Sequence, residues 1–435
     1  MKKILYILLT FIMIFCNLKF VYADDILEEE FSKNDLENII STSATTDEEL
    51  ILNSRIAIAY DRESGKTIWG KNENKRTAMA STTKIMTAII VVEKSNLDDV
   101  VTISSKAAGT GGSRLGLKKN DKISMRDLLY GLMMKSGNDA AVAIAEQIAG
   151  SVDAFVVLMN EKVKELNLKD THFVTPHGLD DPAHYTTAYE LAQIADYALK
   201  NEIIAKVVST KFYTININGY PKDLSNTNEL LGNLEGVNGV KTGFTNNAGR
   251  CLVTSVDRSG FNIITVVIQA DTKKDRTRDS IKIIEHIYEN YMQVNIKEIA
   301  DEKFEEWCNI NKGRISINKA KNLNINLQFN NLENNVVVVK KQDLDNIKIE
   351  INLIFELEAP VKSNTIVGKL KVMVKDVVID VEDVYIENYV AKKDVYDYFF
   401  ECIRAYAWWR SLKKRRVQFF NINKSPPSSK YWQGM

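Results

Sequence analysis

Residues 80–92 read ASTTKIMTAIIVV, and the interpretation of the whole chain starts from this stretch. Ser81 and Lys84 form an S-x-x-K pattern ahead of an apolar run that is long enough for a helix, although its β-branched residues would also suit a strand. In a helix the two side chains share one face. A lysine packed among apolar residues loses solvation, its pKa falls, and it can take the proton of a serine that is otherwise a weak nucleophile. The tetrapeptide alone equally fits a capping serine beside a solvated lysine.

The second motif is Ser136-Gly137-Asn138. A capping pattern at Ser124 opens an apolar-faced helix before it, and a new helical pattern runs from Asp139 to near Gly150. The motif is therefore predicted to lie in a short helix–helix turn. Ordinary turn chemistry would also account for these residue types.

The third motif is Lys241-Thr242-Gly243, at the start of a predicted strand hairpin whose turn is residues 246–249. An edge strand with a surface lysine would explain it as well. The order S-x-x-K, S-x-N, K-T-G is typical of class A β-lactamases and penicillin-binding proteins. Three motifs in that order, each in a suitable structural context, indicate a serine acyl-transfer enzyme.

The surrounding pattern predicts an α/β fold. Strands are expected at 54–60 and 67–69, and again at 252–256 and 262–269, with helices between them and a helix at 278–291. This order fits an antiparallel sheet flanked by helices and built from both ends of the segment. After about residue 297 the pattern changes to short strands, of which 347–353 alternates most regularly. We expect a small all-β domain that serves as a spacer or docking module.

Composition and the N-terminal residues indicate a secreted globular protein. The 435 residues carry 57 basic and 57 acidic side chains, so net charge gives no argument for nucleic-acid binding. Lys2 and Lys3, an apolar run over 4–15 and the small residue Ala23 fit a signal peptide cleaved after residue 23. The predicted domains are 1–23 signal peptide, 24–52 flexible acidic lead-in, 53–294 catalytic domain, 295–390 all-β domain and 391–435 membrane-anchor tail.

The cysteines and histidines suggest no further chemistry. Three scattered cysteines remain after the predicted cleavage, and they do not form a disulfide framework. The four histidines show no H-E-x-x-H spacing, so no metal site is expected.

Residues 394–412 predict an amphipathic helix. Asp397, Glu401, Arg404 and Ser411 recur at helical spacing as a narrow polar stripe, aromatic residues fill the remaining surface, and a basic run follows at 413–416. Charges inside the stretch argue against a membrane span, and aromatic residues with a basic flank suit a helix lying in the membrane interface. A helix packed on the protein, or a span with its basic end in the cytoplasm, remains open.

From about residue 53 to its tail, the chain resembles the low-molecular-weight penicillin-binding proteins, which are serine-type D-alanyl-D-alanine carboxypeptidases. The similarity includes residues 80–84, 135–140, 177–180 with 184–185, and 240–245 with 248–249. The resemblance implies a fold like that of β-lactamases and transpeptidases. It also implies peptidoglycan stem peptides as substrates, β-lactams as inhibitors, and a location on the outer face of the cytoplasmic membrane.

The resemblance assigns a role to each motif residue. It makes Ser81 the nucleophile and Lys84 its general base. Ser136 links Lys84 to the leaving amine, and Asn138 orients Lys84 and holds the substrate amide. In the third motif, Lys241 and Thr242 bind the terminal carboxylate next to Gly243, and the backbone N–H groups of Ser81 and Phe244 form the oxyanion hole.

Two differences between this chain and known sequence patterns bear on function. Some relatives place an arginine between two asparagines ahead of the K-T-G strand, where this chain has Thr227. A class A β-lactamase needs a glutamate that activates the deacylating water, and Val163 stands at that place of the E-x-x-L-N pattern. The competing functions are a peptidoglycan DD-endopeptidase, a β-lactamase, and an inactive wall-binding protein that penicillin would not acylate.

Overall fold

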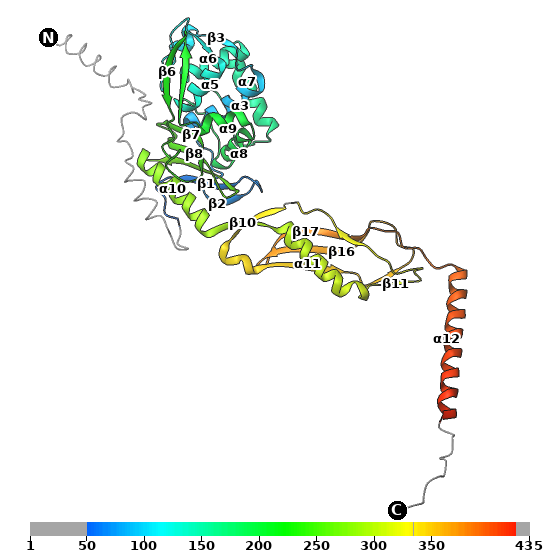
Figure 1. The fold of residues 1–435 in the computed structure, drawn as a ribbon. Coiled ribbons are helices and arrows are strands. Elements are labelled where there is room, and N and C mark those ends of the chain that lie inside the picture. Colours follow the sequence, from blue (N-terminus) through cyan, green and yellow to red (C-terminus); the bar gives the residue numbers. More distant parts are fainter. Residues whose placement is uncertain (1–49, 334, 423–435) are drawn as a thin grey trace, which may run out of the picture. The chain divides into compact units, whose positions relative to one another are not determined.

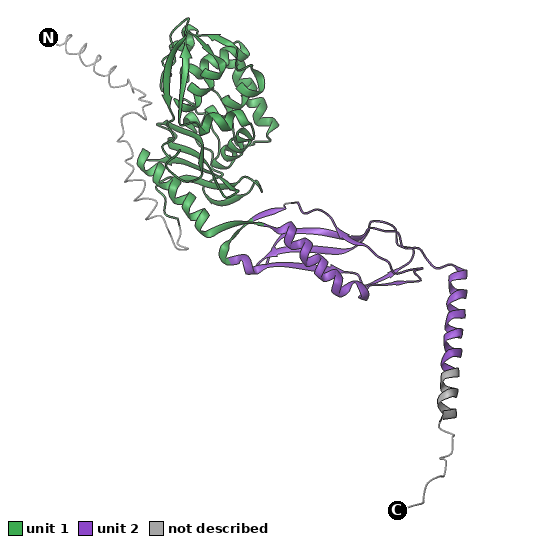
Figure 2. Cartoon of the chain, viewed as in Figure 1, with its two compact units in different colours: residues 1–294, 338–342 green, residues 295–337, 343–435 purple. Residues whose placement is uncertain are grey.

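The computed structural model describes residues 50–333 and 335–422. The predicted signal peptide and nearly all of the predicted lead-in lie outside these residues. The described chain forms two compact units, residues 50–294 with 338–342 and residues 295–337 with 343–422 (Figure 2). Each unit is described by itself.

The first unit is built on a five-stranded antiparallel sheet in the order β2-β1-β9-β8-β7 (Figure 1). Its strands are β1 (Ile56–Asp61), β2 (Thr67–Lys71), β7 (Val237–Thr245), β8 (Gly249–Arg258) and β9 (Phe261–Ala270). Ile58 in β1 lies opposite Val266 in β9. The prediction of a sheet made from both ends of the segment is therefore confirmed, and β7, which carries the third motif, is an edge strand.

Helix α10 (Lys273–Asn290) covers one face of this sheet. Its buried residues Ile281, Ile284 and Ile287 share a core with Leu252 of β8 and Ile263 of β9. The helix begins five residues before the predicted start, because the Thr272 side chain accepts the Asp275 N–H at 3.0 Å and caps it there.

A group of helices covers the other face (Figure 1). They are α3 (Lys84–Lys94), α4 (Ser105–Ala108), α5 (Met125–Met134), α6 (Asn138–Ala149), α7 (Val152–Glu165), α8 (Ala188–Leu199) and α9 (Glu202–Ser209). The ambiguous apolar run at 85–92 is helical, and Ile85 and Ile89 are buried in the same core as Ile58 and Val266. Burial of residues 85–91 favours the helix, since tertiary packing outweighs the modest strand preference of the β-branched residues.

The helix ends follow the capping residues that the sequence offers. Ser124 caps α5 by accepting the Asp127 N–H at 3.0 Å, and α6 ends at Gly150 with φ +75°, as predicted. Helix α7 stops at Glu165, because the chain turns at Asn167 with φ +56°. A small second sheet was not anticipated, namely β3 (Val100–Thr102), β4 (Lys122–Ser124), β5 (Phe212–Ile217) and β6 (Tyr220–Ser225).

The second unit contains the predicted β domain. Its main sheet has the order β12-β17-β16-β14, with β12 (Leu327–Phe329), β14 (Ile347–Leu353), β16 (Thr365–Val374) and β17 (Val377–Ile386). The shorter strands are β11 (Ser316–Asn318) and β15 (Glu356–Glu358). Strands β10 (Tyr291–Asn295) and β13 (Val336–Lys340) form a separate two-stranded ribbon, most of whose residues belong to the first unit. The structure adds a helix that the sequence pattern did not reveal, α11 (Ile296–Asn311), which buries Ile296, Ala300 and Phe304.

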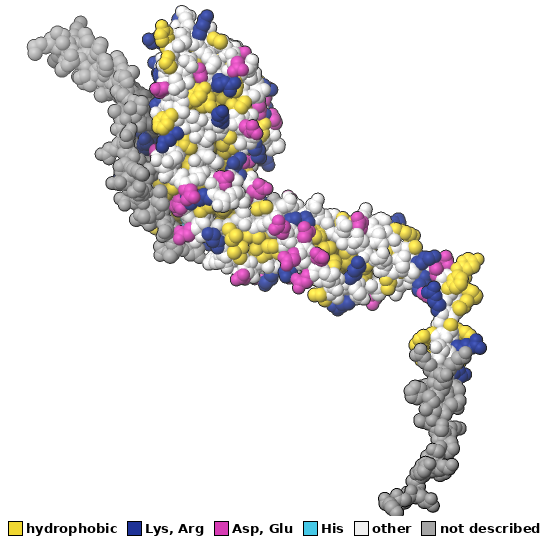
Figure 3. Space-filling model, in the orientation of Figure 1, with side chains coloured by type: hydrophobic (Ala, Val, Ile, Leu, Met, Phe, Trp, Pro, Cys, Tyr) yellow, Lys and Arg dark blue, Asp and Glu magenta, His cyan; other side chains and the backbone are white. Residues whose placement is uncertain are grey.

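The chain continues into α12 (Val395–Ile422), at the place of the predicted amphipathic helix. Over residues 395–413 its aromatic side chains are exposed, with Tyr396 74% and Trp408 68% exposed, and Figure 3 shows hydrophobic side chains along this part. Over residues 50–333 and 335–422, no single helix is long and apolar enough to cross a membrane. Helices α6 and α7 reach that threshold only as a bent pair, by length and composition alone.

Candidate active site

Ser81 lies in a single 3-10 turn (Ala80–Thr83) that leads directly into α3. Lys84 is the first residue of α3, so the two side chains sit on one face, and Lys84 Nζ lies 2.8 Å from Ser81 Oγ. The turn is held in an unusual backbone conformation, with Ala80 at φ +48°. Such a conformation costs free energy in a residue other than glycine and persists where the surroundings enforce it.

Lys84 is completely buried and has three polar neighbours. Besides Ser81 Oγ, its Nζ contacts Asn138 Oδ1 at 2.7 Å and His177 O at 2.8 Å. Both of these oxygens can only accept hydrogen bonds. A neutral amine would give its two hydrogens to these oxygens, which leaves its lone pair directed at the Ser81 hydroxyl. This arrangement is what a serine needs from a base.

The electrostatic surroundings favour the neutral amine. Burial lowers the pKa of Lys84 well below its ordinary value of 10.5, and the positive charge of Lys241 lowers it further, while Asp139 opposes the shift. Desolvation is the larger cause because a charged ammonium loses its hydration when it is buried. Lys84 is thus suited to accept a proton from Ser81.

The second motif connects Lys84 to the helical part of the unit. Asn138 opens α6, and its Nδ2 donates to Gly111 O at 2.7 Å, which fixes the direction in which Oδ1 faces Lys84. Ser136 lies in the turn before it, at φ +58° and only 7% exposed. The structure therefore brings Ser81, Lys84 and Asn138 into direct contact and places Ser136 two residues away in the same turn.

The third motif lies on the inner side of the edge strand β7. A Cβ atom added to Gly243 would be 3.1 Å from Ser81 N and 3.2 Å from Ala80 Cβ. Glycine therefore lets the strand run close to the turn at 80–83 that carries the predicted nucleophile Ser81, here called the nucleophile turn. Lys241 is 1% exposed and donates from Nζ to Thr242 O at 2.8 Å. Phe244 follows, with the Arg250 guanidinium 3.9 Å from its ring centroid.

Thr242 pairs with the residue that replaces the arginine of some relatives. The hydroxyl oxygens of Thr242 and Thr227 are 2.8 Å apart. Thr227 is held by its neighbours, since Asn226 Nδ2 donates to Thr210 O at 3.1 Å and Asn228 Nδ2 donates to Gly239 O at 3.1 Å. The two asparagines therefore fix the backbone, and the residue between them faces the motif strand.

A loop formed by residues 172–187 closes the site from the other side, and the three motifs gave no indication of its contribution. His177 supplies the carbonyl that Lys84 contacts, and a Cβ on Gly178, which has φ +89°, would be 1.9 Å from Ala80 O. Thr245 Oγ1 donates to Asp180 Oδ1 at 2.6 Å, which ties the loop to the end of β7. Backbone carbonyls leave no trace in residue identity, so only the family resemblance at 177–180 and 184–185 marked this loop in advance.

His184 fastens the same loop to the nucleophile turn. Its Nδ1 accepts the Val174 N–H at 2.9 Å, so its Nε2 carries the hydrogen and faces Thr83 Oγ1 at 2.8 Å. Burial lowers the pKa of His184 to about 4 and that of His177 to about 3, so both rings are neutral at pH 7. Neither histidine is arranged as the base of the site.

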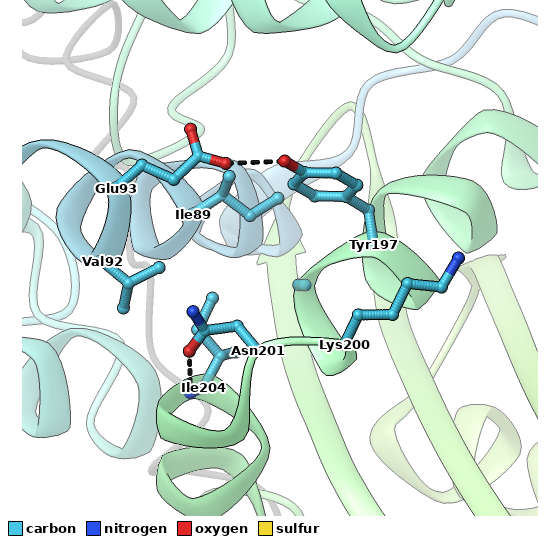
Figure 4. A pocket seen from close by; sticks show the side chains of 8 residues that line it. Ile89, Val92, Glu93, Tyr197, Lys200, Asn201 and Ile204 are labelled. Atoms are coloured by element: carbon cyan, nitrogen blue, oxygen red, sulfur yellow. Dashed lines mark hydrogen bonds between the residues drawn. The ribbon is translucent and has the colours of Figure 1, made fainter.

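A pocket of about 230 Å³ lies on the opposite end of α3 (Figure 4). Ile89, Val92 and Glu93 of α3 line it together with residues of α8 and α9, and Tyr197 Oη donates to Glu93 Oε1 at 2.8 Å. None of the three motifs contributes a lining residue. The chemistry-bearing groups therefore gather at the N-terminal end of α3.

Comparison with known proteins agrees with this geometry. The family described as D-alanyl-D-alanine carboxypeptidase (Peptidase_S11) matches residues 42–272, and the family described as the C-terminal domain of penicillin-binding protein 5 matches residues 312–396. The D-alanyl-D-alanine carboxypeptidase DacF of Bacillus subtilis is 34% identical over 352 residues, which cover 80% of this chain and 86% of that protein. DacD of Escherichia coli is 31% identical over 338 residues, covering 73% and 82% of the two chains.

Solved structures show the same relationship. The D-alanyl-D-alanine carboxypeptidase DacD from Francisella tularensis superposes with a TM-score of 0.64 at 26% identity, covering 81% of this chain and 98% of that one. Penicillin-binding protein 5 from Haemophilus influenzae gives 0.63 at 28% identity, covering 80% and 100%. The Streptomyces K15 DD-transpeptidase gives 0.54 at 34% identity and covers 56% of this chain and 99% of that one.

The state of Lys84 predicts a pH dependence. The reaction needs the Lys84 amine in its neutral form. The rate at which benzylpenicillin acylates the protein should therefore rise as the pH passes the lowered pKa of Lys84, far below pH 10.5. Lys84→Arg should remove about 10²–10⁴-fold of the rate, because a guanidinium stays protonated. Intact-protein mass spectrometry over a pH series measures both. A wild-type rate that begins to rise only near pH 10 would contradict a depressed pKa.

The hydroxyl pair predicts a role in binding. We expect Thr242 to bind the substrate carboxylate; a carboxylate can only accept hydrogen bonds, so the Thr242 hydroxyl would donate to it and accept from Thr227. Thr227→Val keeps the shape but removes this donor, at a cost of about 1 kcal/mol, or roughly fivefold in KM for a peptide ending in D-Ala-D-Ala. Steady-state D-Ala release measures the change. Thr214→Val on exposed β5 is the matched control, and equal KM values for both variants would remove Thr227 from the binding site.

Proposed function

This chain belongs to the D-alanyl-D-alanine carboxypeptidase family of serine hydrolases, and we propose that it removes the terminal D-Ala of peptidoglycan stem pentapeptides through an acyl-enzyme on Ser81. The observation that carries this assignment is the buried Lys84 amine, 2.8 Å from Ser81 Oγ, with two fixed acceptors on its other sides. Burying a lysine that has no carboxylate bonded to it costs free energy. Such burial is typical of sites in which the lysine acts as the base for a nucleophile.

Acylation begins with proton transfer. Ser81 Oγ attacks the carbonyl carbon of the penultimate D-Ala while Lys84 takes the hydroxyl proton. The developing oxyanion lies between the backbone N–H groups of Ser81 and Phe244, where β7 approaches the nucleophile turn. The C–N bond then breaks, and the proton returns from Lys84 through Ser136 to the leaving amine of the terminal D-Ala.

Substrate binding uses the remaining motif residues. Asn138 holds the substrate amide, while Thr242 and Lys241 bind the terminal carboxylate, with the Thr227 hydroxyl supporting Thr242. The positive charge of Lys241 attracts the carboxylate and also disfavours a charged Lys84. Without an arginine between the asparagines, carboxylate recognition depends more on hydroxyl groups and Lys241. Water then hydrolyses the ester, and no cofactor takes part in these steps.

β-Lactams would enter the same sequence of steps as substrate mimics. Ser81 opens the strained lactam and forms an ester with the opened ring. Val163, where a class A β-lactamase would carry its glutamate, is 6% exposed and packs in the helical core. The protein is therefore proposed to bind penicillin without turning it over rapidly.

Replacing the proposed nucleophile tests the assignment. Benzylpenicillin should form a one-to-one adduct with the wild-type chain and none with Ser81→Ala, and the wild type should release D-Ala from a peptide ending in D-Ala-D-Ala. Ser64→Ala, in the turn between β1 and β2, is a matched serine control. An adduct without D-Ala release would favour a DD-endopeptidase, rapid penicillin turnover a β-lactamase, and no adduct an inactive wall-binding protein.

We further propose that the mature chain is exported and held at the membrane surface by α12. The helix presents Phe399, Trp408 and Trp409 to solvent, each more than half exposed, beside the polar stripe that begins at Asp397. Aromatic side chains of this kind favour the boundary between headgroups and acyl chains, and a basic flank favours anionic lipids. This location would bring the catalytic unit to its wall substrate.

Deleting residues 394–435 tests the anchor. Full-length protein should sediment with vesicles that contain anionic lipid, whereas the shortened protein should stay in the supernatant and still form the penicillin adduct. Replacing Trp408 and Trp409 with alanine should weaken sedimentation without a large deletion. Equal sedimentation of the full-length and shortened proteins would show that α12 does not anchor the chain.

A further inference from the structure

Residues 111–117, here called the strap, lie against the first turn of α6. Asn138 holds one end of the strap, because its backbone N–H donates to Ser113 O at 2.8 Å and its Nδ2 donates to Gly111 O at 2.7 Å. The same Asn138 contacts Lys84 through Oδ1. The position of the strap and the position of the Lys84 amine therefore depend on one side chain.

Asp139 holds the other end of the strap. Its carboxylate is fully buried, with Oδ1 accepting the Leu115 N–H at 2.8 Å and Oδ2 accepting the N–H groups of Gly116 and Leu117 at 2.8 and 3.0 Å. Oδ1 also accepts the N–H of Ala140 at 2.9 Å. A buried carboxylate is costly unless donors surround it, and here three consecutive backbone amides of the strap provide them.

Close packing fixes the strap from two more sides. Leu115 is 1% exposed, and a Cβ on Gly131 of α5 would lie 2.4 Å from its Cδ2, while a Cβ on Gly137 would lie 3.1 Å from its Cβ. Both glycines therefore make room for this one side chain. On the other side, Lys222 of β6 donates from Nζ to Leu115 O at 2.5 Å.

We propose that Asp139 is a positioning residue for the reaction: by binding the strap to the start of α6, it fixes Asn138 and thereby the Lys84 amine that faces Ser81. This inference rests on the proposed roles of Ser81 and Lys84. The geometry supports this role, because Asn138 and Asp139 are adjacent in the chain, and Asn138 holds one end of the strap while Asp139 holds the other. A displaced strap would release Asn138 Nδ2 and allow Oδ1 to turn away from Lys84.

Asp139 also contributes charge to the site. The charged groups that act on Lys84 are Lys241 from β7, which lowers its pKa, and Asp139 from α6, which raises it. His177 and His184 from the loop at 172–187 are neutral near pH 7, since burial lowers their pKa values to about 3 and about 4. Loss of the Asp139 charge should therefore lower the pKa of Lys84 further.

The test is Asp139→Asn in the full chain. The variant keeps the size of the side chain, removes its charge and turns an NH2 group toward the strap amides. We expect the second-order rate of acylation by benzylpenicillin to fall about 10–100-fold, as for a misplaced reacting group. We also expect the acid limb of its pH–rate profile to move to lower pH, and amide exchange at 115–117 to quicken.

Asp127→Asn is the matched control. Asp127 is 8% exposed and accepts the Asn216 N–H at 3.0 Å, away from the strap, so its variant should keep the wild-type rate and acid limb. If Asp139→Asn does not fold, Lys222→Ala is used in its place. Lys222 is exposed, its replacement removes the hydrogen bond to Leu115 O, and the acylation rate should fall several-fold.

The outcomes distinguish failure of the proposed function from failure of the positioning role of Asp139. A wild-type chain that forms no adduct on Ser81 would remove the proposed function itself. A wild-type adduct with Asp139→Asn reacting at the wild-type rate would overturn only the positioning role. A slower reaction of Asp139→Asn with an unmoved acid limb would also overturn the positioning role, because Asp139 would then be a purely structural residue. If Asp139→Asn cannot be tested, a wild-type rate for Lys222→Ala would overturn it as well.

Discussion

Burial of the Lys84 amine is the constraint on which the rest of this unit depends. An amine withdrawn from water must either lose its charge or find acceptors, and this site provides two acceptors and a second buried lysine that disfavours charge. The acceptors come from α6 and from the loop at 172–187, and the second lysine comes from β7. Two separate parts of the chain must therefore meet at this nitrogen atom, and a third must lie near enough to act on its charge, for the site to be formed.

Glycines determine how closely those parts meet. Gly243 lets β7 pass beside Ser81 N, and Gly178 lets the loop at 172–187 touch Ala80 O. A methyl group at either place would push an element away from the nucleophile turn. The three sequence motifs are thus more than sets of reactive side chains, since the small residues within and beside them permit the approach that makes the side chains useful.

Much of the fold and the core of the site could be predicted from the sequence. Capping residues such as Ser124 and Gly150 fixed helix ends, and the motifs identified Ser81, Lys84 and Asn138, which are in contact. Helix α11 was missed because the following strands dominated the local pattern, and the part played by His177 was missed because it acts through a carbonyl. Asp139 was not distinguished either, since an aspartate in the first turn of a helix is common for capping reasons alone.

The sheet order has a consequence for how the protein comes into being. Strand β1 pairs with β9, and Asn53 Nδ2 donates to Asp271 Oδ2 across 218 positions of sequence. Contacts between such distant segments form late and slowly. During synthesis, β1 must wait for nearly the whole first unit to appear, and the proposed nucleophile Ser81 has no β7 beside it until that strand follows. The emerging chain would therefore carry its reactive serine in an inactive state until the sheet closes.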